Sequence, residues 1–259
     1  NDGSHLHSVS RVSVSLLSGL VGLGGGIVMT PALVYLSPLV GVEPLDFRLI
    51  TGLTTAQALF AGLSGSRKHD NYHFVHRRLA LWMGVSILPS ALLGATLSKW
   101  MPTQSLIIIF ALMAIVAAVL MWLPRFKTNE DVLEASSLPF SAPLAVGLAV
   151  PVGLLGGMVG QGGSFILIPL MYAAFRLPTR VVIGTNLMIV TCSALAGLIG
   201  KAATGQVPFA LAAMLILGAL PGAYLGSILS RKTKPRMLRF ILAVLIALAG
   251  VKMALGVFT

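Results

Sequence analysis

The sequence predicts an all-α, polytopic membrane protein made of two inverted repeats, and three observations carry this prediction. First, 56% of the 259 residues are hydrophobic and 10% are charged, whereas a soluble domain carries about 25% charged residues. Second, apolar runs at 106–123, 209–229 and 240–258 have the length of about 20 residues that spans a hydrocarbon core. Third, the second half of the chain repeats features of the first.

Two pairs of segments reveal this repeat. Segment 16–33, LLSGLVGLGGGIVMTPAL, and segment 154–171, LLGGMVGQGGSFILIPLM, share a Val-Gly-x-Gly-Gly run and a later proline. Segment 88–98, LPSALLGATLS, matches segment 220–230, LPGAYLGSILS. Because both pairs occur in the same order, the chain is an internal duplication, a pattern common among membrane proteins with symmetric halves.

Each half is expected to form five helical pieces. In the first half these lie at about 9–22, 26–38, 47–65, 78–98 and 104–123. In the second half they lie at about 141–159, 164–175, 180–200, 208–230 and 236–258. The chain therefore divides into a first repeat at 1–123, a cytoplasmic linker at 124–139 and a second repeat at 140–259.

Basic residues orient the two halves. Segment 66–78 carries four Lys or Arg and its counterpart 201–207 carries one; segment 98–103 carries one and its counterpart 231–239 carries five. Lys- and Arg-rich loops face the cytoplasm, so the two repeats are expected to have opposite orientations in the membrane. The net charge of +11 is thereby explained by cytoplasmic loops rather than by binding of nucleic acid.

This orientation requires a re-entrant hairpin in each repeat, at about 9–38 and about 141–175, followed by three transmembrane helices. Both ends of 140–176 fall on the inside, so this segment must enter the membrane and return. Glycine permits the positive φ of such a bend. The N–H groups and the dipole at the start of each returning helix would then form an anion site near the membrane midplane.

The predicted substrate-binding residues are the glycine motifs and the polar side chains inside apolar helices. They are Gly24, Gly25, Gly26, Thr51, Thr54, Thr55, Gln161, Gly162, Gly163, Ser164, Thr185 and Asn186. Two alternatives stay open: close helix packing alone as the role of the glycines, and hydrogen bonds to their own backbone as the role of the threonine hydroxyls. Arg48 and Arg180 begin equivalent helices and are either interfacial anchors or an electropositive entrance.

The charged side chains exclude several kinds of site. All seven acidic residues fall in tails or loops, which disfavours a cationic substrate and a carboxylate proton relay and suits an anion held by neutral donors. Lys201 is expected at the membrane interface. His69, His73 and His76 are expected in a solvated cytoplasmic loop rather than at a metal site, and no metal or cofactor is expected. Cys192, the single cysteine, is expected to pack within an apolar helix without a chemical role.

At the motifs GLGGGIVMTP and GQGGSFILIP, the Gly-Thr-Asn-Leu run at 184–187 and the repeated LPxAxLGxxLS, the chain resembles the TauE/SafE family of membrane permeases. The resemblance implies a secondary transporter or facilitator that exports sulfite, an organosulfonate or a related small anion across the bacterial inner membrane. Its implied partners are that anion and the lipid bilayer, without a catalytic activity; a homodimer is left open. The first half departs from the pattern, with Ile-Thr-Gly-Leu-Thr-Thr at 50–55.

Two other classes of function stay open. One is a membrane-embedded enzyme or sulfur-transfer component, for which Cys192 would have to face a cavity. The other is an anion channel. No predicted span contains a pair of side chains placed for acid–base or metal chemistry, so transport is the leading interpretation.

Overall fold

The computed structural model describes residues 26–36, 45–122, 138–160 and 163–258, and within these ranges the secondary structure is helical. The helices are α2 (Gly26–Leu36), α3 (Phe47–Asp70), α4 (Arg77–Leu97), α5 (Thr103–Trp122), α6 (Ala142–Val159), α7 (Ser164–Phe175), α8 (Thr179–Ala203), α9 (Phe209–Lys232) and α10 (Pro235–Phe258). Their bounds confirm the predicted helices to within a few residues, except that α3 continues past 65 to Asp70. The helix predicted at 9–22 lies outside the described residues.

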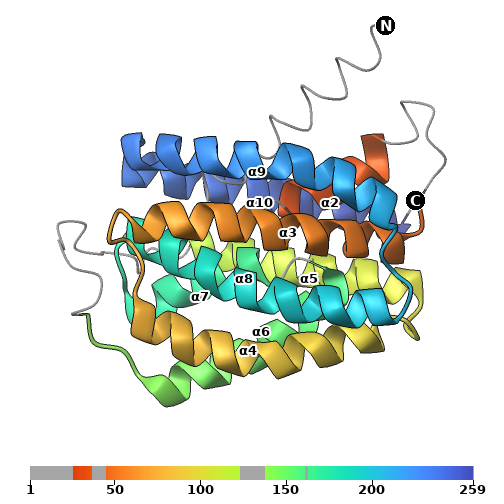
Figure 1. Ribbon diagram of the computed structural model, residues 1–259, viewed down its shortest axis with the longest axis horizontal. Coiled ribbons are helices and arrows are strands. Elements are labelled where there is room, and N and C mark those ends of the chain that lie inside the picture. The colour runs from red at the N-terminus through yellow and green to blue at the C-terminus, as the bar shows by residue number, and fades with distance from the viewer. Residues whose placement is uncertain (1–25, 37–44, 123–137, 161–162, 259) are drawn as a thin grey trace, which may run out of the picture.

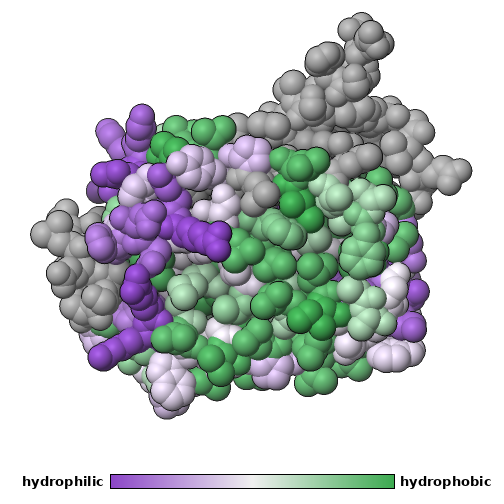
Figure 2. Space-filling view, viewed as in Figure 1, coloured by the Kyte–Doolittle hydropathy of each residue, from purple (hydrophilic) through white to green (hydrophobic). Residues whose placement is uncertain are grey.

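The described helices form a bundle with the surface of a membrane protein. Five of them, α4, α5, α6, α8 and α10, are long and apolar enough to cross a membrane. Large apolar side chains such as Trp82, Val85 and Leu248 are more than half exposed, and Figure 2 shows apolar residues across the middle of the molecule with hydrophilic ones gathered toward its ends. The protein is therefore an all-α, multi-pass membrane protein.

The long helices lie side by side along one direction, with α9 and α10 along one edge and α4 and α6 along the other (Figure 1). Between these edges, α3 packs against α8 and α9, while α8 packs against α3 and α4. Helix α5 packs against α10. This arrangement puts α3 and α8, the equivalent helices of the two halves, next to each other in the interior.

Two sets of loops define the two ends of the bundle. At one end, which we call the basic end, the Arg231 guanidinium lies 4.5 Å from the centre of the Tyr72 ring, and Arg180 Nη2 donates to the Arg231 carbonyl at 3.0 Å. At the opposite end, Ser98 Oγ lies 3.0 Å from Gln206 Oε1. The two basic segments, 66–78 and 231–239, thus share one end of the bundle.

The second predicted hairpin enters and leaves at the basic end. Phe140, just before α6, lies 5.1 Å from the His76 ring and 6.5 Å from the ring of Phe175, the last residue of α7, measured between ring centres. Helix α6 ends at Gly160 and α7 begins after Gly163, and both glycines have positive φ. The chain therefore reverses between α6 and α7. The counterpart hairpin in the first half lies outside the described residues, apart from α2.

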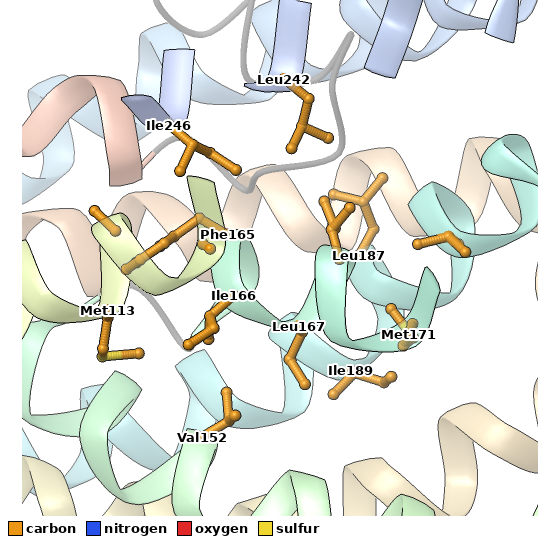
Figure 3. Packing of buried hydrophobic residues seen from close by; sticks show 14 of the residues in the cluster. Met113, Val152, Phe165, Ile166, Leu167, Met171, Leu187, Ile189, Leu242 and Ile246 are labelled. Carbon is orange, nitrogen blue, oxygen red and sulfur yellow. The ribbon is translucent and has the colours of Figure 1, made fainter. Parts of the chain in front are cut away.

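Most of the returning arm of this hairpin is buried, from Ser164 to Tyr172 with Leu170 partly exposed. Phe165, Ile166 and Leu167 of α7 pack among Val152, Leu187 and residues of α5 and α10 (Figure 3). A helix that is apolar all round belongs in the interior, and irregular backbone at membrane depth is stable only where protein or a polar cavity surrounds it. The surrounding helices give the bend that protection.

Equivalent glycines of the two halves make reciprocal contacts. A Cβ on Gly52 of α3 would meet the backbone of Gln206, in the loop after α8. A Cβ on Gly184 of α8 would meet the backbone of Phe74, in the loop after α3. Gly52 matches Gly184 in the repeat, and Phe74 matches Gln206 at the same spacing. Such reciprocity is what a two-fold relation between the halves would produce; the orientation across a membrane stays a prediction.

Cysteine labelling tests that orientation. In a Cys192→Ser background, Arg67→Cys and Lys232→Cys are expected to react with an impermeant maleimide only from the cytoplasm, because both side chains are exposed at the basic end. Lys99→Cys and Ala203→Cys, exposed at the opposite end, should react only from outside. Labelling of Arg67→Cys and Lys232→Cys from opposite faces would contradict the inverted arrangement.

Candidate functional site

A lysine ammonium lies buried where four segments of the chain meet. Lys201 of α8 has no exposed surface. Its Nζ donates to Thr51 Oγ1 at 2.9 Å, Ser98 Oγ at 3.0 Å, the Met158 carbonyl at 3.2 Å and Gln206 Oε1 at 3.3 Å. These five residues, which we call the Lys201 cluster, come from α8, α3, the end of α4, the end of α6 and the loop after α8.

The acceptors in the Lys201 cluster are all neutral. Within the described residues the ion pair found is the one between Arg77 and Asp70, 2.9 Å apart and exposed to solvent. An ammonium has three protons to donate, so the four acceptors satisfy its hydrogen bonds but do not balance its charge. Burial of a charge without a counter-charge costs several kcal/mol. When the Lys201 amine is protonated, the cluster is therefore a positive charge without a counter-charge among the described residues.

This burial corrects one expectation from the sequence, because Lys201 was expected at the membrane interface. The expectation that neutral donors hold the anion stays a prediction. A lysine near a helix end usually extends its ammonium to water, but here the end of α6 and the loops after α4 and α8 cover it. The cover comes from segments far apart in the sequence, so its effect on Lys201 was not evident from the local pattern.

The glycine bend lies beside this cluster. Gly160 caps α6 with φ +81°, and its carbonyl accepts hydrogen bonds from Thr55 Oγ1 at 3.0 Å and Thr54 Oγ1 at 3.3 Å. A Cβ at Gly160 would collide with the carbonyl oxygen of Thr51. The bend is thus held tightly against the first half of α3. Its position near the membrane midplane stays a prediction.

The three threonines bond to their own backbone, which is one of the two alternatives left open by the sequence, and they also contact other segments. Thr54 and Thr55 bond the Thr51 carbonyl of their own helix, at 3.2 Å and 2.6 Å, in addition to Gly160. Thr51 donates to the Arg48 carbonyl at 2.7 Å and accepts from Lys201. Thr51 is therefore the threonine in direct contact with the buried charge, while Thr54 and Thr55 hold the bend.

The remaining predicted side chains do not join this cluster. Thr185 Oγ1 accepts from the backbone N–H of His76 at 2.9 Å, toward the basic end, and Asn186 is fully buried next to it in the chain. Fifteen residues of α8, or roughly 22 Å at 1.5 Å per residue, separate Asn186 from Lys201. Thr185 and Asn186 therefore lie apart from Thr51, Thr54 and Thr55, and the prediction that these residues bind the substrate stays a prediction.

The glycine motifs are described in part. Gly163 begins α7 with φ +71°, and Ser164, the first residue of that helix, is fully buried. Gly26 is the first residue of α2. Gly24, Gly25, Gln161 and Gly162 lie outside the described residues. Binding of the anion by the backbone N–H groups of both bends stays a prediction.

Arg48 and Arg180 hold loops at opposite ends. Arg48 Nη2 donates to the Met101 carbonyl at 2.7 Å, and Arg180 Nη2 donates to the carbonyls of Arg231 and Thr233 at 3.0 Å and 3.5 Å. Each arginine thus fastens the loop between the last two helices of its own half. The interpretation as an electropositive entrance stays a prediction.

Two of the three histidines contradict the expected solvated loop. His69 and His76 are fully buried, whereas His73 is exposed in the turn with φ 58°. His76 accepts the Leu79 N–H at Nδ1 and contacts the Leu138 carbonyl at 2.8 Å through Nε2. The reason is that α3 continues to Asp70, so the basic segment is mostly helix and a short turn. No group of three metal-binding side chains occurs in the described part of the chain.

The apolar helices and the reversed hairpin define a multi-pass membrane protein with a polar cluster in its interior. The chain belongs to the sulfite exporter TauE/SafE family, whose model matches residues 11–253. It is thus a membrane transporter, which agrees with the names of its relatives.

Three relatives illustrate the similarity across nearly the whole chain. The probable membrane transporter protein YunE of Bacillus subtilis is 26% identical and covers 97% of this chain and 99% of its own length. YjnA of the same organism is 28% identical, covering 93% and 95%. MJ0441 of Methanocaldococcus jannaschii is 22% identical, covering 93% and 92%. No solved structure matches the chain.

Proposed function

We propose that this transporter exports a small monovalent oxyanion, with sulfite in its hydrogensulfite form or an organosulfonate as the substrate, across the bacterial inner membrane. The observation that carries the proposal is that the basic residue Lys201 is buried inside the bundle, whereas the described acidic residues are not. The two acidic residues that the structure describes, Asp46 and Asp70, lie at helix ends outside the core. Proton- and cation-coupled transporters usually place carboxylates along their path.

A monovalent anion is favoured by the cost of dehydration. That cost grows with the square of the charge, and the interior supplies one ammonium and neutral donors in place of water. Hydrogensulfite is available in the cell because the second pKa of sulfurous acid is near neutrality. The direction and the sulfur chemistry rest on the family, whose description is sulfite exporter.

The surroundings of Cys192 give no support to a sulfur-transfer component. Cys192 is half-buried, and its Sγ lies 3.3 Å from where a Cβ on Gly84 would stand, at the packed contact between α8 and α4. It is also outside the Lys201 cluster. We infer that the chain carries substrate without a reaction of its own.

Counterflow in liposomes tests the proposal. Protein-only vesicles preloaded with unlabelled sulfite should accumulate 35S-sulfite transiently and saturably, and external methanesulfonate should compete, whereas sulfate should compete weakly. Empty vesicles provide the background. Uptake that rises linearly with concentration and shows no counterflow would indicate a channel, and no uptake of any of these anions by monodisperse protein would contradict the proposal.

A further inference from the structure

We propose that the Lys201 ammonium is the positive group that binds the transported anion, while the hydroxyl oxygens of Thr51 and Ser98 accept hydrogen bonds from it and hold it in place. This assignment rests on the proposed function and names the residue that supplies its charge. The expected ligand is a small monovalent oxyanion, whose oxygens accept hydrogen bonds from the ammonium.

The hydrogen bonds of Lys201 can be exchanged for bonds to an anion. Three ammonium protons face four acceptors, so one acceptor always lacks a full bond. The two longest contacts are those to Met158 and Gln206. An oxyanion that replaces them keeps Lys201 bonded to both hydroxyls and balances the charge. A hydrogen bond between two oppositely charged groups is stronger than the bond from the ammonium to a neutral acceptor that it replaces.

The energetics of this position indicate a function. A methionine would fill similar space without a buried charge, and replacement of buried ions by apolar residues is often neutral or stabilising. The lysine makes no ion pair in the described part of the chain. The free-energy cost of removing its charge from water is therefore not offset by a salt bridge there. Ionisable groups inside membrane helices are expensive and usually mark a substrate path.

The duplication provides independent support. In the alignment that pairs Arg48 with Arg180, Lys201 occupies the position of His69 in the first half. His69 is also fully buried, and neither ring nitrogen has a hydrogen-bond partner among the described residues. The repeat thus places a side chain able to carry positive charge at the same point of both equivalent helices, at opposite ends of the bundle.

The test compares Lys201→Met with Lys99→Met. Lys99 lies next to Ser98 at the same end of the bundle but is exposed, so its variant removes an equal charge outside the cluster. The readout is the unfolding temperature of purified protein during titration with sulfite or methanesulfonate in chloride-free buffer. Wild type and Lys99→Met should be stabilised with the same apparent affinity. Lys201→Met should unfold at the wild-type temperature or above without anion.

With anion present, Lys201→Met is expected to bind roughly tenfold to a hundredfold more weakly, the range that loss of one hydrogen bond to a charged group gives. Lys201→Arg, which keeps the charge, should retain part of the affinity. Equal affinity of Lys201→Met and wild type would overturn the assignment and leave anion transport intact. Absence of both anion stabilisation and liposome uptake in wild type would instead overturn the proposed function.

A second variant decides the matter if Lys201→Met yields no folded protein. Thr51→Val removes one acceptor of the Lys201 ammonium and keeps the lysine, and valine has nearly the shape of threonine. Its affinity for sulfite should fall severalfold, because a hydrogen bond that holds the ammonium in place is lost. Wild-type affinity in Thr51→Val together with wild-type affinity in Lys201→Arg would place the anion elsewhere.

Discussion

Gly160→Ala is expected to abolish the folded protein. At φ +81° a Cβ is strained in the left-handed region, and here it would also collide with the carbonyl oxygen of Thr51. That neighbour is backbone inside a buried helix, so it cannot rotate away as a side chain would. The backbone strain alone costs about 1–2 kcal/mol, and the loss of packing between α3 and the bend adds to it. Together they are a large share of a total stability of about 5–15 kcal/mol.

The measurement is the yield of monodisperse protein in detergent, with Gly147→Ala as its matched control. Gly147 lies in the same helix, α6, and a Cβ there meets nothing within 4 Å. Gly147→Ala should leave the yield unchanged and stabilise the protein by about 0.4–1 kcal/mol. If Gly160→Ala matched Gly147→Ala in yield and unfolding temperature, the close packing of the bend on α3 would be wrong.

Gly52→Ala and Gly184→Ala are expected to destabilise the protein strongly and by similar amounts. Each new methyl group would meet the backbone of the loop that follows the other helix, at Gln206 for Gly52 and at Phe74 for Gly184. Overpacking of a well-packed interior costs about 1–3 kcal/mol and more where backbone must move. The equality of the two effects follows from the reciprocal contacts of the repeats.

Gly197→Ala is the matched control for this pair. It lies on α8, the helix of Gly184, and its Cβ would meet one side-chain methyl, of Thr55, at 3.3 Å. A side chain can adjust by a few tenths of an ångström, so the unfolding temperature should change little. A large drop for one of Gly52→Ala and Gly184→Ala with no drop for the other would contradict a symmetric role.

The helices could be predicted because apolar length and turn residues mark them directly. The main error was the end of α3, where Arg67, Lys68 and His69 were assigned to a loop. Cationic side chains suit the last turn of a helix, whose carbonyl end is negative, so charge alone does not end a helix. The buried positions of His69 and His76 follow from those extra turns.

The polar site was predictable only in part. Thr51 and the bend were found from hydroxyls and glycines within apolar runs, and the structure brings them together. Thr185 was included with them as a polar side chain inside an apolar helix. However, the contacts of Gly52 with Gln206 and of Gly184 with Phe74 show that α3 and α8 run antiparallel. Matching residues far from the centre of such a pair lie at opposite ends.

Lys201 could not be recognised from its own neighbourhood in the sequence. Ser98 and Gln206, two of its acceptors, lie in segments expected to be loops, and their approach to α8 depends on tertiary packing. The one sequence signal available was the duplication, which aligns Lys201 with His69. When both repeats of a membrane protein carry an ionisable residue at the same position of a long helix, that position is a candidate functional site.

The most direct test of the account is the position of a bound anion. Selenite is the selenium analogue of sulfite, and anomalous diffraction at the selenium edge would locate it in crystals of protein with ordinary methionine. The account predicts a selenium peak within hydrogen-bonding reach of Lys201 Nζ, between Thr51 and Ser98, that is absent in Lys201→Met crystals. A peak at the basic end, beside Arg231 or Arg180, with none at Lys201 would contradict it.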